Sequence, residues 1–454
     1  MEKKGKIVIV GAGIAGLTTA YQLVLAGYEV VVIERDDAVG GLSRTYKNGG
    51  FSFDSGPHRF YTKNPQVIDF IQDILGEGYL SMKMTSSVYL LGKYYDWPLS
   101  LKVVLKLPFR VMFLAAIDMV RLAFKKTMPA DTYSEYILQK YGKTLYQIDF
   151  NPYTAKFAKI PTSQLHADWA KAGVNRAVIN EKVKMDSIFD VVKNTLFPQK
   201  ENITILYPKE GISVFSEVLK KRIEEKGGRI LLKAKPVSFK VEDKEITEVG
   251  ISDGSKIERP EHVVWTGSIN EAASLLGLPG RELEYLNIIT YNVALKGRPR
   301  MEDQWIYYVD ADLVFNRLYN TVRFSPYKAP KGCYGLCVEV TCRNGSRLLE
   351  KPERLYGRVI EDLKKVRLVK DSSEVLGISH QLLYQAYPLY KVNYRAQLRK
   401  AFDDINTSVR NLTLAGRNGL FWYNNMDHSI ENAFETAGNI MKGSRHIAIN
   451  EFWK

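Results

Sequence analysis

The feature that most constrains this 454-residue chain is a glycine-rich hexapeptide, GAGIAG, at residues 11–16. The apolar run 6–10 precedes it, a helix-forming stretch follows to Ala26, and the β-branched run 29–34 comes next. Short apolar runs bounded by glycine predict strands, so the order is strand, turn, helix and a second strand that ends in an acid. This order predicts a βαβ unit that binds a dinucleotide.

Each residue type in this unit has a physical role. Gly11 permits the tight turn, Gly13 lets the main chain approach a pyrophosphate, and Gly16 lets the helix pack on the strand. The N-terminus of the helix would face the phosphates, since its first N–H groups have no partner within the helix. Glu34 would bind the ribose hydroxyls.

A second glycine-rich stretch, VGGLSRT at residues 39–45, follows the second strand directly. Gly40 and Gly41 would let the chain pass close to a bulky ligand, and Arg44 offers a fixed fork of donors to a phosphate. The stretch therefore predicts a second pyrophosphate contact, with an exposed turn as the alternative. These motifs do not decide between NAD and FAD.

Together with FDSGPHRF at residues 53–60, the two glycine-rich stretches resemble the FAD-binding superfamily of amine oxidases, protoporphyrinogen oxidases and UDP-galactopyranose mutases. LAGRNG at 414–419 and YNNMDHSI at 423–430 are similar to the segment that runs alongside the flavin in this superfamily. The resemblance implies an α/β fold. It implies a Rossmann-type, glutathione reductase-like domain that binds FAD non-covalently, and an interleaved α+β substrate domain.

The middle of the chain resembles the mutase-like branch of the superfamily. YGKTLY at 141–146 and PYTAK at 152–156 carry this similarity. After Lys156, however, the chain continues FAKIP to Pro161, where mutases carry WG. This departure favours an oxidoreductase over a mutase.

Flavin motifs at both ends of the chain predict interleaved domains. The FAD-binding domain is expected to comprise residues 1–80, 205–270 and 406–454, and the substrate domain residues 81–204 and 271–405. Alternating runs at 305–309, 335–340 and 381–387 predict a second, largely antiparallel sheet whose solvent-poor face would form the floor of the substrate site.

The resemblance also implies site residues. The candidate cofactor-binding residues are Gly11, Ala12, Gly13, Ile14, Ala15, Gly16, Glu34, Arg35, Gly40, Gly41, Leu42, Arg44, Gly56, His58, Val237, Gly416, Arg417, Met426, Asp427 and Ile430. The candidate catalytic residues are His58, Arg317, Arg417, Tyr384 and Tyr387. His58 would stand against the flavin, and Arg417 would reach the flavin or a substrate phosphate. Asp427 is also a candidate helix N-cap.

Two reactions are open at this point. In one, a substrate C–H or N–H bond delivers hydride to flavin N5, and dioxygen or another acceptor reoxidises the flavin. In the other, reduced N5 attacks the anomeric carbon of a UDP-sugar without net oxidation. For the second reaction, the residues available to hold a diphosphate and stack a uracil are Arg317, Arg323, Tyr384, Tyr387, Tyr390 and Lys391. We expect an FAD-dependent oxidoreductase, with the mutase as the alternative and a membrane-attached binding protein as a third class.

Composition and charge limit the kinds of partner that this chain can bind. The net charge is +14, but acidic residues are interspersed with the basic ones and no nucleic-acid-binding motif accompanies them. We therefore expect a small-molecule substrate, anionic or lipid-like, and no nucleic acid. Three cysteines, Cys333, Cys337 and Cys342, predict a reducing compartment without a disulfide scaffold or a metal site. On a strand, Cys342 would face away from the other two.

Residues 103–124 are rich in Leu, Val, Phe and Met and are the candidate segment for contact with a membrane. Lys106, Arg110, Asp118 and Arg121 interrupt this stretch, so it is a poor membrane span. At 100° per residue the four charges fall on one side, which predicts an amphipathic helix. We expect its apolar face to pack inside the substrate domain, with peripheral membrane contact as the alternative. Because no apolar signal segment precedes the first strand, we expect a cytoplasmic protein.

Overall fold

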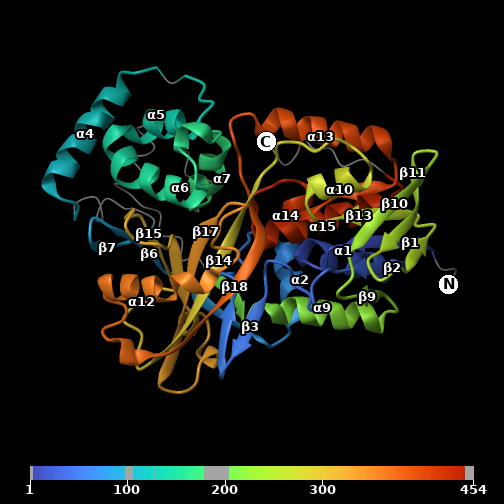
Figure 1. Cartoon of the computed structure of the whole chain (residues 1–454), viewed down its shortest axis with the longest axis horizontal. Helices are drawn as coiled ribbons and strands as arrows, with labels where there is room; N and C mark the ends of the chain where they lie inside the picture. Colours follow the sequence, from blue (N-terminus) through green and yellow to red (C-terminus); the bar gives the residue numbers. More distant parts are fainter. Residues whose placement is uncertain (1–3, 98–105, 127, 178–203, 445–454) are drawn as a thin grey trace.

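The computed structural model describes residues 4–97, 106–126, 128–177 and 204–444. These residues form a parallel sheet with helices on it, a large mixed sheet and a block of helices, which Figure 1 shows at the right, lower left and upper left. The parts of the predicted domains at 1–3, 98–105, 127, 178–203 and 445–454, and residues 103–105 of the predicted amphipathic helix, lie outside the described residues.

The parallel sheet has the strand order β19-β13-β1-β2-β9. Its strands are β1 (Lys4–Val10), β2 (Tyr28–Ile33), β9 (Arg229–Leu231), β13 (His262–Trp265) and β19 (Leu412–Leu414). β1 is central, with Ile7 paired to His262 on one side and to Val30 on the other. The sheet is thus assembled from three stretches of the chain that lie far apart in sequence. The domain boundaries proposed from the sequence stay predictions.

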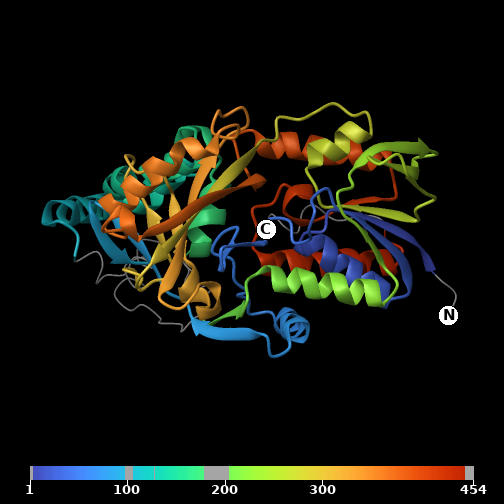
Figure 2. The same ribbon diagram turned by 60° about the horizontal axis from the view of Figure 1, so that its bottom comes forward.

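Both faces of the parallel sheet are covered, which explains why β1 and β2 are apolar at consecutive positions. Ile7 and Ile9 pack in one cluster with side chains of α1 (Ile14–Leu25), α9 (Ser213–Glu225) and α15 (Met426–Met441). Val8 and Val10 pack in the other cluster, with side chains of β11 (Glu245–Ile251), α10 (Ile269–Leu275) and α13 (Tyr394–Ser408). Figure 2 shows α1, α9 and α15 below the sheet and α10 and α13 above it. β11 belongs to an antiparallel sheet with β10 (Pro236–Glu242) and β12 (Lys256–Glu258).

The large sheet has the order β18-β14-β17-β16-β15-β6-β7. Its strands are β6 (Ser86–Leu90), β7 (Lys93–Asp96), β14 (Tyr285–Lys296), β15 (Trp305–Tyr308), β16 (Arg317–Asn320), β17 (Cys333–Cys342) and β18 (Val375–Pro388). All neighbours are antiparallel except β15 and β6, so the prediction of a largely antiparallel second sheet is confirmed. Cys342 packs on one face with helix α12 (Tyr356–Lys365), whereas Cys333 and Cys337 pack on the other face, as predicted.

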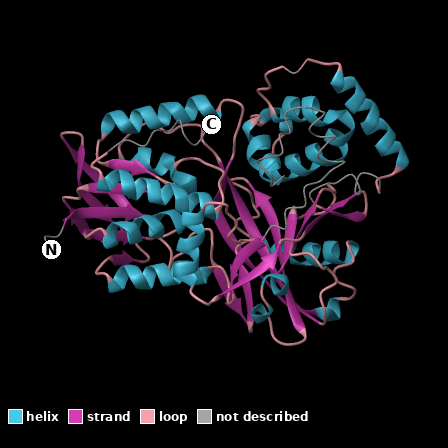
Figure 3. Cartoon of the chain, turned by 180° about the vertical axis from the view of Figure 1, so that it is seen from behind, coloured by secondary structure: helices cyan, strands magenta, loops and turns pink. Residues whose placement is uncertain are grey.

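The helical block covers one end of the large sheet, and Figure 3 shows it from behind as a group of helices beside the strands. It contains α4 (Phe109–Ala123), α5 (Tyr133–Leu145), a π-helical turn (Tyr146–Phe150), α6 (Asn151–Ala158) and α7 (Asp168–Ala177). The expectation that the apolar face of α4 packs inside the substrate domain holds only in part. Val111 and Met112 pack against an apolar cluster and Ala115 is buried, whereas Phe109, Phe113 and Val120 are exposed.

The remaining elements connect these parts. The hairpin of β3 (Thr45–Asn48) and β4 (Phe51–Asp54) and the pair of β5 (Tyr79–Lys83) and β8 (Thr204–Pro208) form two separate antiparallel two-stranded sheets. Short helices are α2 (Pro65–Leu75), α11 (Thr321–Phe324) and α14 (Gly416–Gly419), with 3-10 turns at Thr162–Gln164, Pro326–Lys328, Pro352–Leu355 and Ser372–Glu374. Among the described residues, no helix is both long enough and apolar enough to cross a bilayer.

Candidate active site

A cavity of about 1210 Å³ opens at the carboxyl ends of β1, β2 and β13. In open parallel sheets, ligand clefts form at this edge, where the connections of neighbouring strands leave toward opposite faces. Gly11 and Gly13 line the cavity after β1, Glu34 lines it after β2, and Thr266 and Gly267 line it after β13. We call it the dinucleotide cavity.

The structure brings most of the predicted cofactor-binding residues to this cavity. Those that line it are Gly11, Gly13, Ile14, Ala15, Glu34, Arg35, Gly40, Gly41, Leu42, Arg44, His58, Val237, Gly416, Arg417 and Met426. Tyr384, predicted as catalytic, also lines it. The predicted residues that do not line it are Ala12, Gly16, Gly56, Asp427 and Ile430.

Three of these exceptions have packing roles. A Cβ on Gly16 would lie 1.9 Å from the carbonyl oxygen of Gly11, so Gly16 is the close helix–strand contact that its position in the motif predicts. A Cβ on Gly56 would lie 2.9 Å from Oε1 of Glu339, so a larger residue would crowd this carboxylate. Ile430 is fully buried between α15 and the parallel sheet.

Glu34 is positioned by main-chain donors. Its Oε2 accepts a hydrogen bond from the N–H of Ala12 at 2.7 Å, and its Oε1 accepts one from the N–H of Asp36 at 2.9 Å. Burial raises the pKa of this carboxyl, and the two hydrogen bonds oppose the rise. Each oxygen has a further acceptor site, which suits the two hydroxyls of a ribose.

The start of α1 is open to a ligand. Gly13 is its N-cap residue and offers no side-chain cap, so the first N–H groups of the helix have no side-chain partner there. A Cβ on Gly13 would meet nothing within 4 Å, and Gly40 lies beside Gly13 in an isolated bridge. An uncapped helix N-terminus at a glycine-lined wall fits the pyrophosphate of a dinucleotide.

Two glycine substitutions separate binding from folding. Gly13→Val is expected to fold but to bind flavin at least about tenfold more weakly. Its side chain would fill space where a pyrophosphate fits. Gly16→Val is expected to prevent folding, since its Cβ meets the carbonyl of Gly11. Flavin absorbance per protein and circular dichroism measure the two effects. A folded, fully yellow Gly13→Val would contradict the assignment of the cavity.

Arg44 lines the dinucleotide cavity but has protein partners. Its guanidinium lies 3.0 Å from Asp37 and 3.6 Å from Asp36. Its hydrogen bond to Asp37 lowers the pKa of that carboxyl. The contact of Arg44 with a pyrophosphate stays a prediction. It requires the guanidinium to bind the pyrophosphate and the two aspartates at the same time.

The start of α15 corrects one expectation. Asn425, not Asp427, caps this helix: its side chain and that of His428 form a reciprocal capping box. Asn425 is extended, with φ of −101° and ψ of 179°: its side chain accepts from the N–H of His428, and Nδ1 of His428 accepts from the N–H of Asn425 at 3.2 Å. Asp427 is the second residue of the helix and lies outside the cavity lining, whereas Asn425 and Met426 line it.

Arg417 brings a positive charge to the wall of the dinucleotide cavity. Its guanidinium donates to the carbonyl oxygen of Ala386 at 2.8 Å and to that of Asn424 at 2.5 Å. It lies 5.1 Å from the centre of the Tyr387 ring. Within the described part of the chain, no carboxylate forms an ion pair with Arg417. Its charge is therefore available to a negative group in the cavity.

Tyr387 lies between Arg417 and a second, smaller cavity of about 140 Å³. Tyr387 accepts a hydrogen bond from Arg317 at 3.4 Å, and Arg317 lines this second cavity. We call it the aromatic cavity because of its lining. Its walls are Val88, Trp97, Tyr133, Asp149, Phe150, Tyr153, Thr154, Phe157, Trp169, Tyr307, Val309, Arg317 and Tyr423.

The charge of Arg317 is neutralised within the protein. Its Nε lies 2.8 Å from Oε2 of Glu339, and its Nη2 lies 3.0 Å from Oε1 of the same carboxylate. Glu339 is 1% exposed. This bidentate pair crosses neighbouring strands, since Arg317 of β16 stands opposite Glu339 of β17.

The residues proposed to hold a diphosphate and a uracil do not converge. Arg323 pairs with Glu302 at 2.9 Å, and Lys391 pairs with Glu284. Tyr390 is buried and stacks on Tyr394 with ring centres 4.3 Å apart. Tyr384 is about half exposed and lines the dinucleotide cavity, whereas Tyr387 is buried.

Asp149 is the main site residue that the sequence did not reveal. It lies in the π-helical turn between α5 and α6, is 6% exposed and lines the aromatic cavity. No hydrogen bond or ion pair joins its side chain to another residue in the described ranges. Burial raises its pKa to about 7. π-helical turns inside helices are frequent at functional sites, but their sequence carries no distinctive signal.

The Thr266–Gly267 turn was missed for a different reason. It follows β13 directly, and ligand sites gather at the carboxyl ends of parallel strands. Once β13 is placed beside β1, the same rule that identified Gly11 identifies this turn. The signal was present, but it needed the strand order.

His58 is expected to remain neutral at any physiological pH. Burial lowers its pKa to about 3, Asp54 opposes this shift, and the charges of Arg417, Arg317 and Arg59 add to it. In the unfolded chain, histidine takes up a proton near pH 6.5. The unfolded state therefore binds more protons between pH 6.5 and 3, and the free energy of unfolding falls as the pH drops through this window.

The protonation of His58 can be measured directly. The ring carbon resonances of His58 in labelled protein should stay those of a neutral imidazole at pH 5, and His58→Gln should reduce the acid-dependent loss of stability. His380, which faces Tyr356 on the far part of the large sheet, is a control position for the assignment. A His58 ring that titrates near pH 6.5 would contradict the expected burial.

The parallel sheet and its cavity define a dinucleotide-binding α/β protein. The chain belongs to the family of flavin-containing amine oxidoreductases, whose model matches residues 14–441. The L-amino-acid oxidase of Crotalus adamanteus is 45% identical over 67 residues, which are 15% of this chain and 13% of that protein. The chain thus matches only about an eighth of the length of this curated relative.

Solved structures share the whole fold at low sequence identity. A reduced UDP-galactopyranose mutase superposes with a TM-score of 0.83 at 20% identity, over 98% of this chain and 95% of the other. A putative protoporphyrinogen oxidase from Exiguobacterium sp. 255-15 superposes with a TM-score of 0.76 at 16% identity, over 98% and 99%. These similarities establish the fold that the sequence predicted, a Rossmann-type α/β domain with a second, interleaved α+β part.

Proposed function

We propose that this chain is an FAD-dependent oxidoreductase that takes hydride from a small and largely apolar substrate. The aromatic cavity carries this proposal. Eight of its thirteen lining residues are aromatic, and its one arginine, Arg317, is already paired with Glu339. Such a lining favours an apolar or aromatic molecule over a diphosphate.

The dinucleotide cavity has residues that fit FAD held without a covalent bond. The glycine turn and the open start of α1 suit its pyrophosphate, and Glu34 suits its ribose. Bound FAD would supply a two-electron acceptor for a substrate hydride, with dioxygen or another acceptor closing the cycle. The charge of Arg417 would stabilise negative charge that develops at this wall, and the neutral His58 can donate or accept one hydrogen bond there.

The chain itself offers a proton acceptor in the aromatic cavity. A substrate that loses hydride from carbon and becomes a carbonyl or imine also loses a proton from oxygen or nitrogen. Asp149 faces the cavity without a described partner, and its pKa of about 7 places it near working pH. We assign it the role of general base.

A mutase would need free cations for the diphosphate of a nucleotide sugar. Arg317, Arg323 and Lys391 each have a carboxylate partner, so binding a diphosphate would have to break these pairs. This pattern supports the oxidoreductase over the mutase.

Anaerobic flavin absorbance tests the proposal. The oxidised holoenzyme is mixed with panels of amines, porphyrinogens and polyenes, and the dithionite-reduced holoenzyme is incubated with UDP-sugars. We expect at least one apolar substrate to bleach the oxidised flavin, and the absorbance to return in air. Isomerised sugar from the reduced enzyme, without bleaching by any of the panels, would establish the mutase instead.

A further inference from the structure

Helix α4 presents an apolar face to solvent. Phe109 is 78% exposed, Phe113 57% and Val120 60%, and Phe124, directly after the helix, is 89% exposed. At 100° per residue these four side chains share one side of the helix. α4 lies at the outer edge of the helical block in Figures 1, 2 and 3, so no described element covers this side.

The opposite side of α4 fixes this orientation. Oδ2 of Asp118 accepts hydrogen bonds from the N–H of Thr144 at 2.6 Å and from its hydroxyl at 2.7 Å. Ala115 is the buried residue of the helix, and the side chain of Asp118 is 13% exposed. Asp118 thus faces the protein beside Val111, Met112 and Ala115, while the phenylalanines point outward.

The exposed charges around this face are all positive. Arg110, Arg121, Lys125 and Lys126 are exposed, and the only acidic residue between 106 and 126 is Asp118, which points inward. An apolar face bordered by arginine and lysine complements a bilayer surface that carries anionic headgroups.

We propose that α4 binds the surface of an anionic lipid bilayer. Phe109, Phe113 and Phe124 enter the boundary between headgroups and acyl chains, and the four basic side chains contact lipid phosphates. The helix lies in the plane of the surface. This docking does not depend on which reaction the protein catalyses.

The docked helix would place the aromatic cavity beside the lipid. Val111 and Met112 of α4 pack against the same apolar cluster as Trp97, Tyr153 and Tyr307, three residues that line the cavity. If the proposed function holds, a substrate dissolved in the bilayer would have a short path to the site. This second step rests on the proposed function, whereas the docking does not.

Vesicle sedimentation without turnover tests the docking. The holoenzyme is mixed with vesicles of phosphatidylcholine and phosphatidylglycerol in equal parts, or of phosphatidylcholine alone. We expect binding to the anionic vesicles that weakens as salt is raised. The triple variant Phe109→Ser/Phe113→Ser/Phe124→Ser should bind at least about tenfold more weakly, because it removes the apolar face. Wild-type protein that stays in the supernatant with both vesicles would overturn the proposal.

Two further variants keep the result interpretable. Tyr327→Ser/Leu376→Ser removes exposed apolar side chains elsewhere, 66% and 53% exposed, and should bind like wild type. Replacing Arg110, Arg121, Lys125 and Lys126 by glutamine should abolish the preference for anionic vesicles. This glutamine variant gives a result even if the serine variant fails to fold. If the glutamine variant bound anionic vesicles as well as wild type, the proposal would be overturned. So would light scattering that shows a dimer dispersed only by the serine variant, because the face would then bind a second copy of this chain.

Discussion

Lys328→Met is expected to lower the free energy of unfolding by about 3–5 kcal/mol, because it leaves a buried carboxylate without its partner. The side chains of Lys328 and Asp54 are 0% and 1% exposed, and Nζ lies 2.7 Å from Oδ2. Burial lowers the pKa of Lys328, and the neighbouring Asp54 opposes that shift. The ammonium is held in the interior by this pair rather than by water.

Asp54 also joins several parts of the chain. Its Oδ1 accepts hydrogen bonds from the hydroxyl of Thr45 at 2.7 Å and from the N–H of Ile212 at 3.2 Å. Tyr207 donates to its Oδ2 and accepts a hydrogen bond from Lys328 at 2.6 Å. These residues belong to the β3–β4 hairpin, strand β8, the β8–α9 connection and the turn after α11. Loss of the pair should therefore loosen the loop that carries His58 as well.

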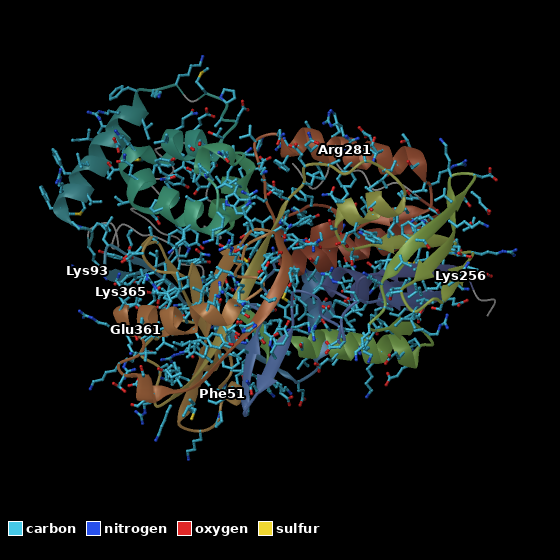
Figure 4. The ribbon with its side chains drawn as sticks, viewed as in Figure 1. Phe51, Lys93, Lys256, Arg281, Glu361 and Lys365 are labelled. Carbon is cyan, nitrogen blue, oxygen red and sulfur yellow. The ribbon has the colours of Figure 1, made fainter. Side chains whose placement is uncertain are left out.

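Urea unfolding measures this prediction, and an exposed ion pair provides its control. Lys365, labelled on α12 in Figure 4, pairs with Asp312, and both side chains are more than half exposed. Lys365→Met should cost less than about 1 kcal/mol, because water screens an exposed pair. The double variant Asp54→Leu/Lys328→Met should recover part of the loss. If Lys328→Met cost no more than Lys365→Met, the buried pair would have no special role.

The parts of the fold that the sequence predicted depend on local patterns. The glycines at 11–16 and the apolar strands beside them can adopt few other arrangements, so the βαβ unit could be read directly from the sequence. The separation of Cys342 from Cys333 and Cys337 follows from strand alternation alone. The family match and the shared fold confirm the class that these patterns predicted.

Features that depend on pairing between distant segments could not be read in this way. The neutralisation of Arg317 requires the register of β16 on β17, which places Glu339 opposite it. As an isolated arginine in the sequence, Arg317 indicated an anion site. With its partner in view, it supports an apolar site instead.

The orientation of α4 shows a second limit of sequence patterns. Periodicity locates an amphipathic helix, but it does not decide which side faces the protein when apolar residues cover more than half of the circumference. The deciding contact is the hydrogen bond from Thr144 to Asp118, 26 residues away. A charge that the sequence assigned to the solvent side is therefore an internal anchor.

Asp149→Asn is expected to slow flavin reduction by the substrate about 10²–10⁴-fold, the usual contribution of a general base. Asp149 lines the aromatic cavity, and asparagine keeps the shape of its side chain but cannot accept the proton. Because burial raises the pKa of Asp149 to about 7, the wild-type reduction rate should rise with pH through about 7 as the carboxylate forms. Stopped-flow absorbance under anaerobic conditions measures this rate.

The pH profile separates catalysis from packing. In Asp149→Asn the rise near pH 7 should vanish while flavin content and thermal stability stay close to wild type. Thr154→Val, which alters another lining residue without a titratable group, should keep the rise. A variant Asp149→Asn that is slow but retains the inflection would make Asp149 a structural residue of the cavity. Another group would then have to produce the inflection, and His58 cannot do so, because burial lowers its pKa to about 3.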